Sequence, residues 1–216
     1  MRRLLAVSAA ALVAVPAANA ASIAVVPRNF SPLNGALAIS GSVSDVRAVG
    51  VQLTTARGRV LGWLRTPEPT QVVSAYWDGT INGVRVRDGY YFVRLVSGRE
   101  ALATTPIRVD SVAPELTDVS ADNGSTPFSG DTALLTTVTP NGDGLRDAAR
   151  FRFRLDEPAT VTLTISRTQN TLEAPLYTRT QSLGAGEHSF DWTPAAGLGP
   201  RTYLGQLTAV DRAANS

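Results

Sequence analysis

The stretch YWDGTINGVRVRDGYYFVRL (residues 76–95) contains three Gly-containing turn signals close together. Asn82-Gly83 is a favoured two-residue hairpin turn, because both residue types tolerate positive φ. Asp78-Gly79 ends the segment before it, and Asp88-Gly89 leads into a run of alternating apolar residues. A loop this rich in Asp, Asn and Gly could also cradle a ligand or a metal ion. The spacing follows strand geometry instead, so the stretch predicts β-strands and not a binding loop.

The same alternation of apolar and polar residues continues on both sides of this stretch, which is the pattern of half-buried strands. In the first half it covers residues 36–43, 49–55, 60–66, 72–77 and 90–96. In the second half it covers residues 151–155, 160–166, 176–183, 187–192 and 202–211. No long stretch carries the apolar stripe of an amphipathic helix. The pattern therefore predicts an all-β protein.

Three landmarks recur at offsets of 108 to 115 residues: Ser31-Pro32 with Thr139-Pro140, Trp77 with Trp192, and Tyr91 with Tyr203. A period near 110 residues with matching landmarks indicates two copies of one structural unit. Short strands separated by frequent turns are typical of a β-sandwich. We therefore predict two tandem immunoglobulin-like (Ig-like) antiparallel β-sandwiches that follow a cleaved signal peptide.

The N-terminus has the layout of a secretory signal peptide. Arg2 and Arg3 precede the apolar run 4–15, and Ala18-Asn19-Ala20 is a cleavage signal. The apolar run is too short to span a bilayer, and no later run approaches spanning length. We expect export of a mature chain without a membrane span, which is either secreted to the extracellular space or held at the cell surface.

The predicted organisation has four parts. Residues 1–20 form the signal peptide, and residues 21–110 form the first sandwich. Residues 111–130 contain a linker and the start of the second unit, with Ala113-Pro114 as the break. Residues 131–216 form the second sandwich.

Composition excludes several classes of function. All 20 basic residues are arginines, against 18 acidic residues, and loss of Arg2 and Arg3 makes the two counts equal. No basic field remains to favour nucleic acid. The absence of cysteine excludes disulfides and thiol chemistry, so packed cores must hold the exported chain together. Arginine without lysine, beside abundant Ala, Gly and Val, is typical of a GC-rich bacterial genome.

A family resemblance adds to this interpretation. WDGTINGVRVRDGYYFVRL resembles the closing signature of the Ig-like domain in flagellar hook-capping proteins (FlgD/Vpr type). TPNGDGLRDAARFRFRLDEPATVTLTI (residues 139–165), GEHSFDW and TAVDRAANS resemble other parts of the same domain. The second copy departs from the signature at FDWTPAAGLGPRTYLG, and no segment resembles the part that engages the flagellar rod. The resemblance therefore implies the Ig-like fold and a role as an appendage of secreted or surface proteins, not flagellar assembly.

The strongest candidate site is the loop 141–147, where Asn141, Asp143 and Asp147 alternate with glycines. Oxygen ligands and a sharp glycine turn suit Ca²⁺, with Asp122 and Asp131 as further candidate ligands. An EF-hand is excluded because the loop lacks its fifth and twelfth ligands. The alternative is a turn whose Asn and Asp side chains cap their own backbone.

Two other groups invite catalytic interpretations. His188 is the only histidine, and Ser189 and Asp191 lie beside it. In a strand His188 faces with Phe190 and Trp192, away from Ser189 and Asp191, which argues against a triad. Asp156-Glu157 resembles a glycosidase carboxylate pair, but neighbouring strand residues face opposite sides, so we expect a solvated turn. No catalytic residue is predicted.

Two further groups invite binding interpretations. Arg150, Arg152 and Arg154 form a cationic row, which either binds an anionic polymer or is the solvated face of a sheet. Trp77 and Trp192 occupy equivalent repeat positions, which favours packing, so Trp63 is the better candidate for surface binding.

These observations favour a non-catalytic secreted or cell-surface module that acts as a spacer or as an adhesion or presentation scaffold. The alternatives are a carbohydrate- or cell-wall-binding accessory module and the non-catalytic front of a longer secreted hydrolase. A protein or a cell-envelope polymer is the expected kind of partner. Ca²⁺ is the only cofactor that the sequence suggests, and the oligomeric state stays open.

Overall fold

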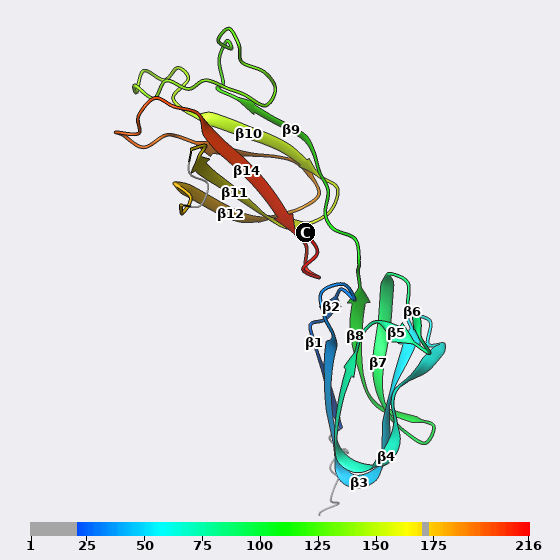
Figure 1. Ribbon diagram of the computed structural model, residues 1–216. Coiled ribbons are helices and arrows are strands. Elements are labelled where there is room, and N and C mark those ends of the chain that lie inside the picture. Colours follow the sequence, from blue (N-terminus) through cyan, green and yellow to red (C-terminus); the bar gives the residue numbers. More distant parts are fainter. Residues whose placement is uncertain (1–20, 170–172) are drawn as a thin grey trace, which may run out of the picture.

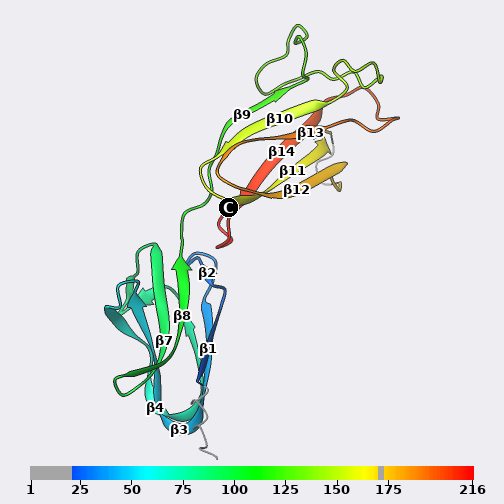
Figure 2. The ribbon, with the colours of Figure 1, turned by 180° about the vertical axis from the view of Figure 1, so that it is seen from behind.

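The computed structural model describes residues 21–169 and 173–216, and the predicted signal peptide lies outside them. The described residues form two all-β bodies that lie end to end (Figure 1), which confirms the predicted fold class. Among them, no helix is long and apolar enough to span a bilayer. The same arrangement is seen from behind in Figure 2.

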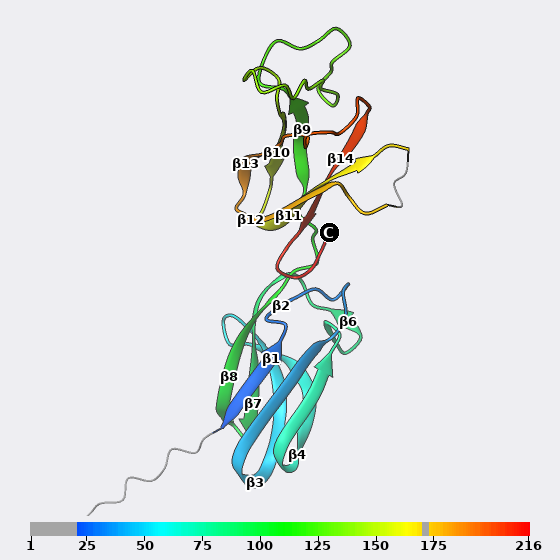
Figure 3. The same cartoon turned by 90° about the vertical axis from the view of Figure 1, so that its left-hand side faces the viewer.

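The first sandwich is built from β1 (Ser22–Val26), β2 (Asn29–Phe30), β3 (Leu37–Thr55), β4 (Val60–Trp77), β5 (Thr80–Ile81), β6 (Val84–Arg85), β7 (Gly89–Ser97) and β8 (Glu100–Val109). The first part of β3 pairs with β1 and with the end of β4, whereas its last part pairs with β7 and with the start of β4. Strands β3 and β4 therefore run through both layers. Figure 3 shows this long bent hairpin at the free end of the first sandwich.

The sequence pattern divided β3 and β4 into four short strands, whereas the structure joins them into two long ones. The bend in β3 coincides with register shifts between Ser42 and Arg47. The backbones of β3 and β4 also approach closely at Gly50, where a Cβ would lie 2.8 Å from the Trp63 ring and 2.9 Å from the Arg65 carbonyl oxygen. Glycine at this position lets β4 cross tightly over β3.

The hairpin predicted in the opening stretch is present. Ile81 pairs with Val84 across the turn, and Asn82 and Gly83 both have positive φ (52° and 76°). The Asp78 carboxylate accepts hydrogen bonds from the Thr80 N–H and hydroxyl, which closes the turn before β5. Each of these residues has a structural role that its local chemistry explains.

The second sandwich is built from β9 (Leu116–Asp122), β10 (Ala149–Leu155), β11 (Ala159–Arg167), β12 (Tyr177–Leu183), β13 (Gly186–Trp192) and β14 (Tyr203–Val210). One layer has the order β13-β10-β9, and the other has the order β12-β11-β14. Here Asp156-Glu157-Pro158 separates β10 from β11, where β3 runs through without interruption in the first sandwich.

Each sandwich has its own core. In the first, the predicted inward residues Leu37, Ile39, Val51 and Leu53 are buried. In the second, most of the predicted inward residues of β10, β11 and β13 are buried: Phe153, Leu155, Val161, Leu163, Ile165, Phe190 and Trp192. Phe151, also predicted inward, is half-buried. Burial of each such side chain stabilises the fold by roughly 1.5–3 kcal/mol. The period-2 prediction is therefore confirmed at these positions.

The repeat landmarks occupy equivalent places. Trp77 ends β4 opposite Leu37, and Trp192 ends β13 opposite Ala149. The Tyr91 hydroxyl donates to the Arg87 carbonyl oxygen at 2.6 Å, and the Tyr203 hydroxyl donates to the Gly199 carbonyl oxygen at 2.8 Å. Both bonds reach four residues upstream, as in the tyrosine corner of Ig-like sandwiches.

Candidate functional site

The feature that distinguishes this structure from two isolated sandwiches is the joint between them. We define the joint as the linker 110–115, the loop 31–36 of the first sandwich, the turn 156–158 and the C-terminal turn 211–216. The views agree that the C-terminal turn lies between the two bodies (Figure 2). Parts of the chain from both sandwiches therefore meet here.

The linker is hydrogen-bonded at both of its ends. Ser111 donates its N–H and its hydroxyl to the Asp88 carboxylate of the first sandwich, at 3.0 Å each. Glu115 donates its N–H to the Asp156 carboxylate of the second sandwich at 2.7 Å. These bonds hold the linker against a turn of each body.

The C-terminal turn adds a second connection. The Asp211 carboxylate accepts hydrogen bonds from the N–H groups of Ala213 and Asn215, at 2.7 and 2.8 Å, which folds the turn on itself. The Asn215 side chain is buried and donates to the Asp110 carbonyl oxygen at 3.1 Å. From the first sandwich, the Asn34 side chain donates to the Ala214 carbonyl oxygen at 2.7 Å. The two bodies are thus joined by a buried and an exposed side-chain amide hydrogen bond as well as by the linker.

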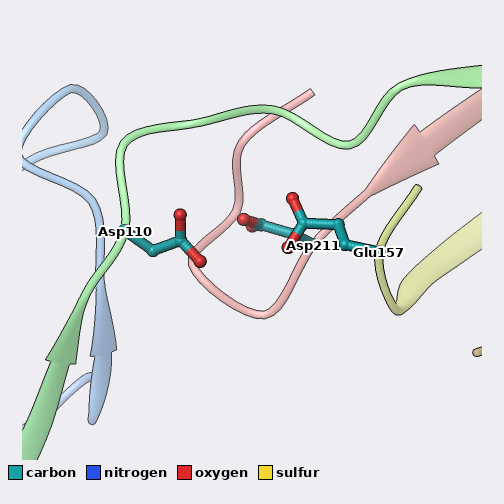
Figure 4. A group of neighbouring side chains, drawn as sticks. All are labelled: Asp110, Glu157 and Asp211. Carbon is teal, nitrogen blue, oxygen red and sulfur yellow. The ribbon is translucent and has the colours of Figure 1, made fainter. Parts of the chain in front are cut away.

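Three carboxylates converge at this joint, as Figure 4 shows. One oxygen each from Asp110, Glu157 and Asp211 lies within 4.8 Å of the others. Asp110 follows β8, Glu157 lies in the turn between β10 and β11, and Asp211 follows β14. Among the described residues, no other trio of acidic or histidine side chains comes this close together.

The protein itself supplies partners for two of the three carboxylates. Arg108 forms an ion pair with Asp110 at 2.8 Å, and the N–H groups of the C-terminal turn bind Asp211. No hydrogen bond to the Glu157 carboxylate is found among the described residues. Burial, and then the charges of Asp110 and Asp211, raise the pKa of Glu157. The trio has the spacing of a hard-cation site, but these contacts by themselves assign it no metal.

Sequence reasoning expected a solvated turn at Asp156-Glu157, and this is wrong for Glu157. Its carboxylate is half-buried against acidic groups from both sides of the joint. The pattern of one strand could not place Asp110 and Asp211 beside it. One sequence signal could have indicated that Asp110 and Asp211 are related: a Val-Asp pair follows an alternating run at both 109–110 and 210–211.

The predicted calcium loop has the hydrogen bonds of a self-capped turn. Asp147 accepts from the N–H groups of residues 141, 142 and 144 at 2.8 to 3.0 Å, and these bonds lower its pKa. Asp143 accepts from Leu145 N–H at 2.7 Å, and Asn141 accepts from Asp143 N–H at 3.1 Å. The carboxylates of Asp122 and Asp131 do not join a cluster with them. Each of the three side chains thus accepts hydrogen bonds from backbone N–H groups of the same loop. Calcium binding at this loop stays a prediction.

The other candidates are placed as follows. The His188 ring lies 5.9 Å from the Phe153 ring and its Nε2 lies 2.8 Å from the Gly184 carbonyl oxygen. Ser189 and Asp191 are exposed on the opposite face, as the strand alternation predicted. Asp191 binds Arg150 instead, through two hydrogen bonds of 2.7 and 3.1 Å. This arrangement is not that of a catalytic triad.

The arginine row is matched by acidic partners. Arg150 pairs with Asp191 at 2.7 Å, Arg152 with Asp122 at 2.6 Å and Arg154 with Glu187 at 4.0 Å. The hydrogen bond from Arg152 lowers the pKa of Asp122, and that from Arg150 lowers the pKa of Asp191. Since every arginine of the row has a carboxylate partner, these contacts favour the solvated-face interpretation.

No family model matches the chain, and no curated protein matches it. Among solved structures, it is similar to trypsin-activated alpha-2-macroglobulin from Escherichia coli, with 11% identity, a TM-score of 0.35, and coverage of 90% of this chain and 14% of that one. It is also similar to the BSP domain of a biofilm-associated protein (11%, TM-score 0.30, coverage 88% and 26%). A third is a tetra-tandem repeat in the extending region of a large adhesion protein (16%, TM-score 0.33, coverage 92% and 47%).

The chain thus spans less than half the length of each of these structures. TM-scores this far below 0.5 carry no argument about activity or partner. The resemblance to hook-capping Ig-like domains therefore rests on the sequence motifs alone.

Proposed function

We propose that this chain is a non-catalytic secreted or cell-surface module, in which two coupled Ig-like sandwiches act as a stiff spacer or presentation scaffold. The observation that carries the proposal is the joint. Three contacts resist bending between the two bodies: the linker is bonded at both ends, the buried Asn215 binds Asp110 at the end of the first sandwich, and Asn34 binds the C-terminal turn. Tandem domains without such contacts are expected to move relative to one another.

The length and direction of such a scaffold would position a protein or cell-envelope partner. Loops and exposed strand edges at the far end of either sandwich are the expected contact regions. The proposal needs no reactive group. Calcium bound at the loop 141–147 would stiffen the long connection before β10, and this is a separate proposal.

Stiffness can be measured directly because the chain has no cysteine. We would introduce cysteines at the exposed Ser74 of β4 and the exposed Thr178 of β12, attach nitroxide labels, and record the distance distribution by pulsed electron–electron resonance. The expected result is one narrow distribution. It should broaden when Asn34→Ala and Asn215→Ala remove the amide bonds, while the melting of each sandwich persists.

A broad distribution in the unaltered joint would refute the stiff scaffold. A narrow distribution that survives both substitutions would leave the scaffold stiff but would refute the role of the amide bonds in coupling. The calcium proposal has its own test by calorimetry. A rise in Tm with millimolar calcium that Asp147→Asn removes would support it, and a Tm unaffected by calcium or chelator would refute it.

A further inference from the structure

A hollow of about 340 Å³ lies beside β4 in the first sandwich and touches the joint only at Ala36, the last residue of the loop 31–36. The end of β4, the turn after it and the β5–β6 hairpin surround it together with part of the first half of β4. Its lining residues are Ala36, Trp63, Leu64, Tyr76, Trp77, Asp78, Thr80, Ile81 and Asn82. The volume is at the lower end of the range for small-ligand sites, which is about 300–1,000 Å³.

The inner side of this hollow is held in place by packing. Trp77 is buried, packs on Phe30 with ring centroids 5.4 Å apart, and donates its indole N–H to the Thr80 carbonyl oxygen at 2.6 Å. Ile81 fills the space above Gly62, where a Cβ would lie 2.7 Å from its Cγ2. The hairpin is therefore fixed against the sandwich before any ligand arrives, and preformed sites bind at lower entropic cost.

Two aromatic rings in the lining remain accessible to solvent. Tyr76 is 76% exposed and Trp63 is 41% exposed. Trp63 is anchored on one side, because its ring lies over Gly50. Exposed aromatic side chains gathered at a hollow mark a binding surface more often than scattered apolar residues do.

Polar groups lie beside these rings. Oδ1 of Asp78 accepts both hydrogen bonds from Thr80, which lowers the pKa of Asp78 and keeps it ionised. Among the described residues, no hydrogen bond is found to Oδ2 of Asp78, to the Asn82 amide or to the Tyr76 hydroxyl. The hollow thus offers a carboxylate oxygen, an amide and a phenol next to flat apolar rings.

We propose that this hollow binds a neutral saccharide, one or two sugar rings in size. A pyranose has a C–H face that stacks on an aromatic ring and hydroxyl groups at its edge that need hydrogen-bond partners. An apolar peptide side chain would leave the Asp78 and Asn82 groups buried without partners, which is costly. The ionised Asp78 disfavours acidic sugars and phosphate polymers. The saccharide site does not depend on a stiff joint.

The test uses the full mature chain and four neutral disaccharides: cellobiose, maltose, mannobiose and chitobiose. Binding is measured by saturation-transfer NMR and by isothermal titration calorimetry. We expect at least one disaccharide to bind with a millimolar or lower Kd. Tyr76→Ala and Trp63→Ala should each weaken binding about tenfold or more, because each removes a stacking ring. Asn82→Gly, which suits the positive φ of this residue, should weaken binding a few-fold.

Tyr90→Ala is the matched control, because Tyr90 is also a largely exposed tyrosine but does not line the hollow. It should leave binding unchanged, as should the joint variants Asn34→Ala and Asn215→Ala. Tyr76→Ala keeps the test valid if Trp63→Ala unfolds the sandwich. Absence of binding by all four sugars would overturn the proposal. Binding that survives both Tyr76→Ala and Trp63→Ala would overturn it as well.

Discussion

The two sandwiches solve the same packing problem with different residues. Tyr91 pairs with Thr55, and Tyr203 pairs with Arg167, so the paired strands β3–β7 and β11–β14 match at an offset of 112 positions. At this offset Val93 corresponds to Gly205. In the second sandwich the Phe151 ring occupies the space that a side chain at Gly205 would need, with 2.5 Å between its Cε1 and the position of a Cβ. The first sandwich instead has a side chain at both corresponding positions, Ile39 and Val93.

In the first sandwich the glycine lies in the other layer, at Gly41 of β3. Leu37 and Ala149 face equivalent tryptophans, so Gly41 corresponds to Phe153. A Cβ at Gly41 would lie 3.2 Å from Cδ1 of Leu95, which therefore uses the space that the glycine leaves. The comparison teaches that the architecture repeats as a pattern of alternation and turns. The side-chain volume at equivalent positions differs between the two sandwiches, and a side chain of the other layer uses the space that each glycine leaves.

A second difference is the number of strands that pair with β7 and with its counterpart β14. In the first sandwich β7 pairs with both β3 and β8, and Leu95 is fully buried. In the second, among the described residues, β14 pairs with β11 alone, and Leu207 at the matching position is half-buried. Equivalent leucines therefore differ in burial because one layer has an additional strand.

The largest expected effect tests this difference. Leu95→Ala should destabilise the first sandwich by about 3 kcal/mol, because it leaves a cavity in a closed core. Leu207→Ala should cost the second sandwich only about 1 kcal/mol, because solvent already reaches the side chain. Hydrogen exchange read separately for each sandwich would measure both. Equal losses of stability in the two variants would contradict the proposed difference in burial between Leu95 and Leu207.

The close packing of the Phe151 ring on Gly205 is the next point to test. Gly205→Ala should destabilise the second sandwich by about 1–3 kcal/mol, because the new methyl group meets the Phe151 ring. Thermal unfolding would show the effect, and Phe151→Leu should relieve it partly. Gly184→Ala is the control, since nothing lies within 4 Å of its Cβ position, and it should be neutral. A Gly205→Ala variant as stable as this control would show that the two layers do not pack as described.

The tyrosine corners should behave alike if the two copies are truly equivalent. Tyr91→Phe and Tyr203→Phe each remove one hydroxyl that donates to a carbonyl oxygen four residues upstream. We expect each to cost about 1 kcal/mol in the sandwich that contains it. Urea denaturation of the two variants would measure this. A loss in one sandwich only would restrict the corner to that copy.

The smallest expected effect lies where the two sandwiches meet. Burial and neighbouring acidic groups raise the pKa of Glu157, so its ionisation costs stability that is present at low pH and is lost as the pH rises through its folded pKa. Glu157→Gln should therefore stabilise the chain at pH 7 by up to about 1 kcal/mol. The difference from the wild-type chain should disappear as the pH falls towards 4.5, the ordinary pKa of a glutamate.

Glu115→Gln provides the control for Glu157→Gln, because Glu115 also lies in the joint but does not belong to the trio of converging carboxylates. Thermal denaturation between pH 4 and 8 would separate the two variants. A gain for Glu157→Gln that is the same at every pH would argue against charge repulsion as its cause.

Much of the fold could be predicted from local sequence. The Asn82-Gly83 turn, the inward positions of β10 and β11, and the equivalence of Tyr91 with Tyr203 all follow from short-range chemistry and spacing. The continuity of β3 could not be predicted, because the residues between its two apolar runs read as a turn. In the structure this segment stays extended through a register shift between Ser42 and Arg47, after which pairing with β4 resumes.

The sequence by itself determined the class of the fold, because side chains that alternate along a strand must face opposite sides whatever the strand packs against. It also determined where the chain turns, because Gly, Asn and Asp reach backbone conformations that other residues avoid. Only the tertiary structure decided the joint and the hollow. Asp110, Glu157 and Asp211 are far apart in the chain, and only the packing of the two sandwiches brings their carboxylates together. Trp63 and Asn82 lie on different strands or turns, and only the folded first sandwich places both beside the hollow.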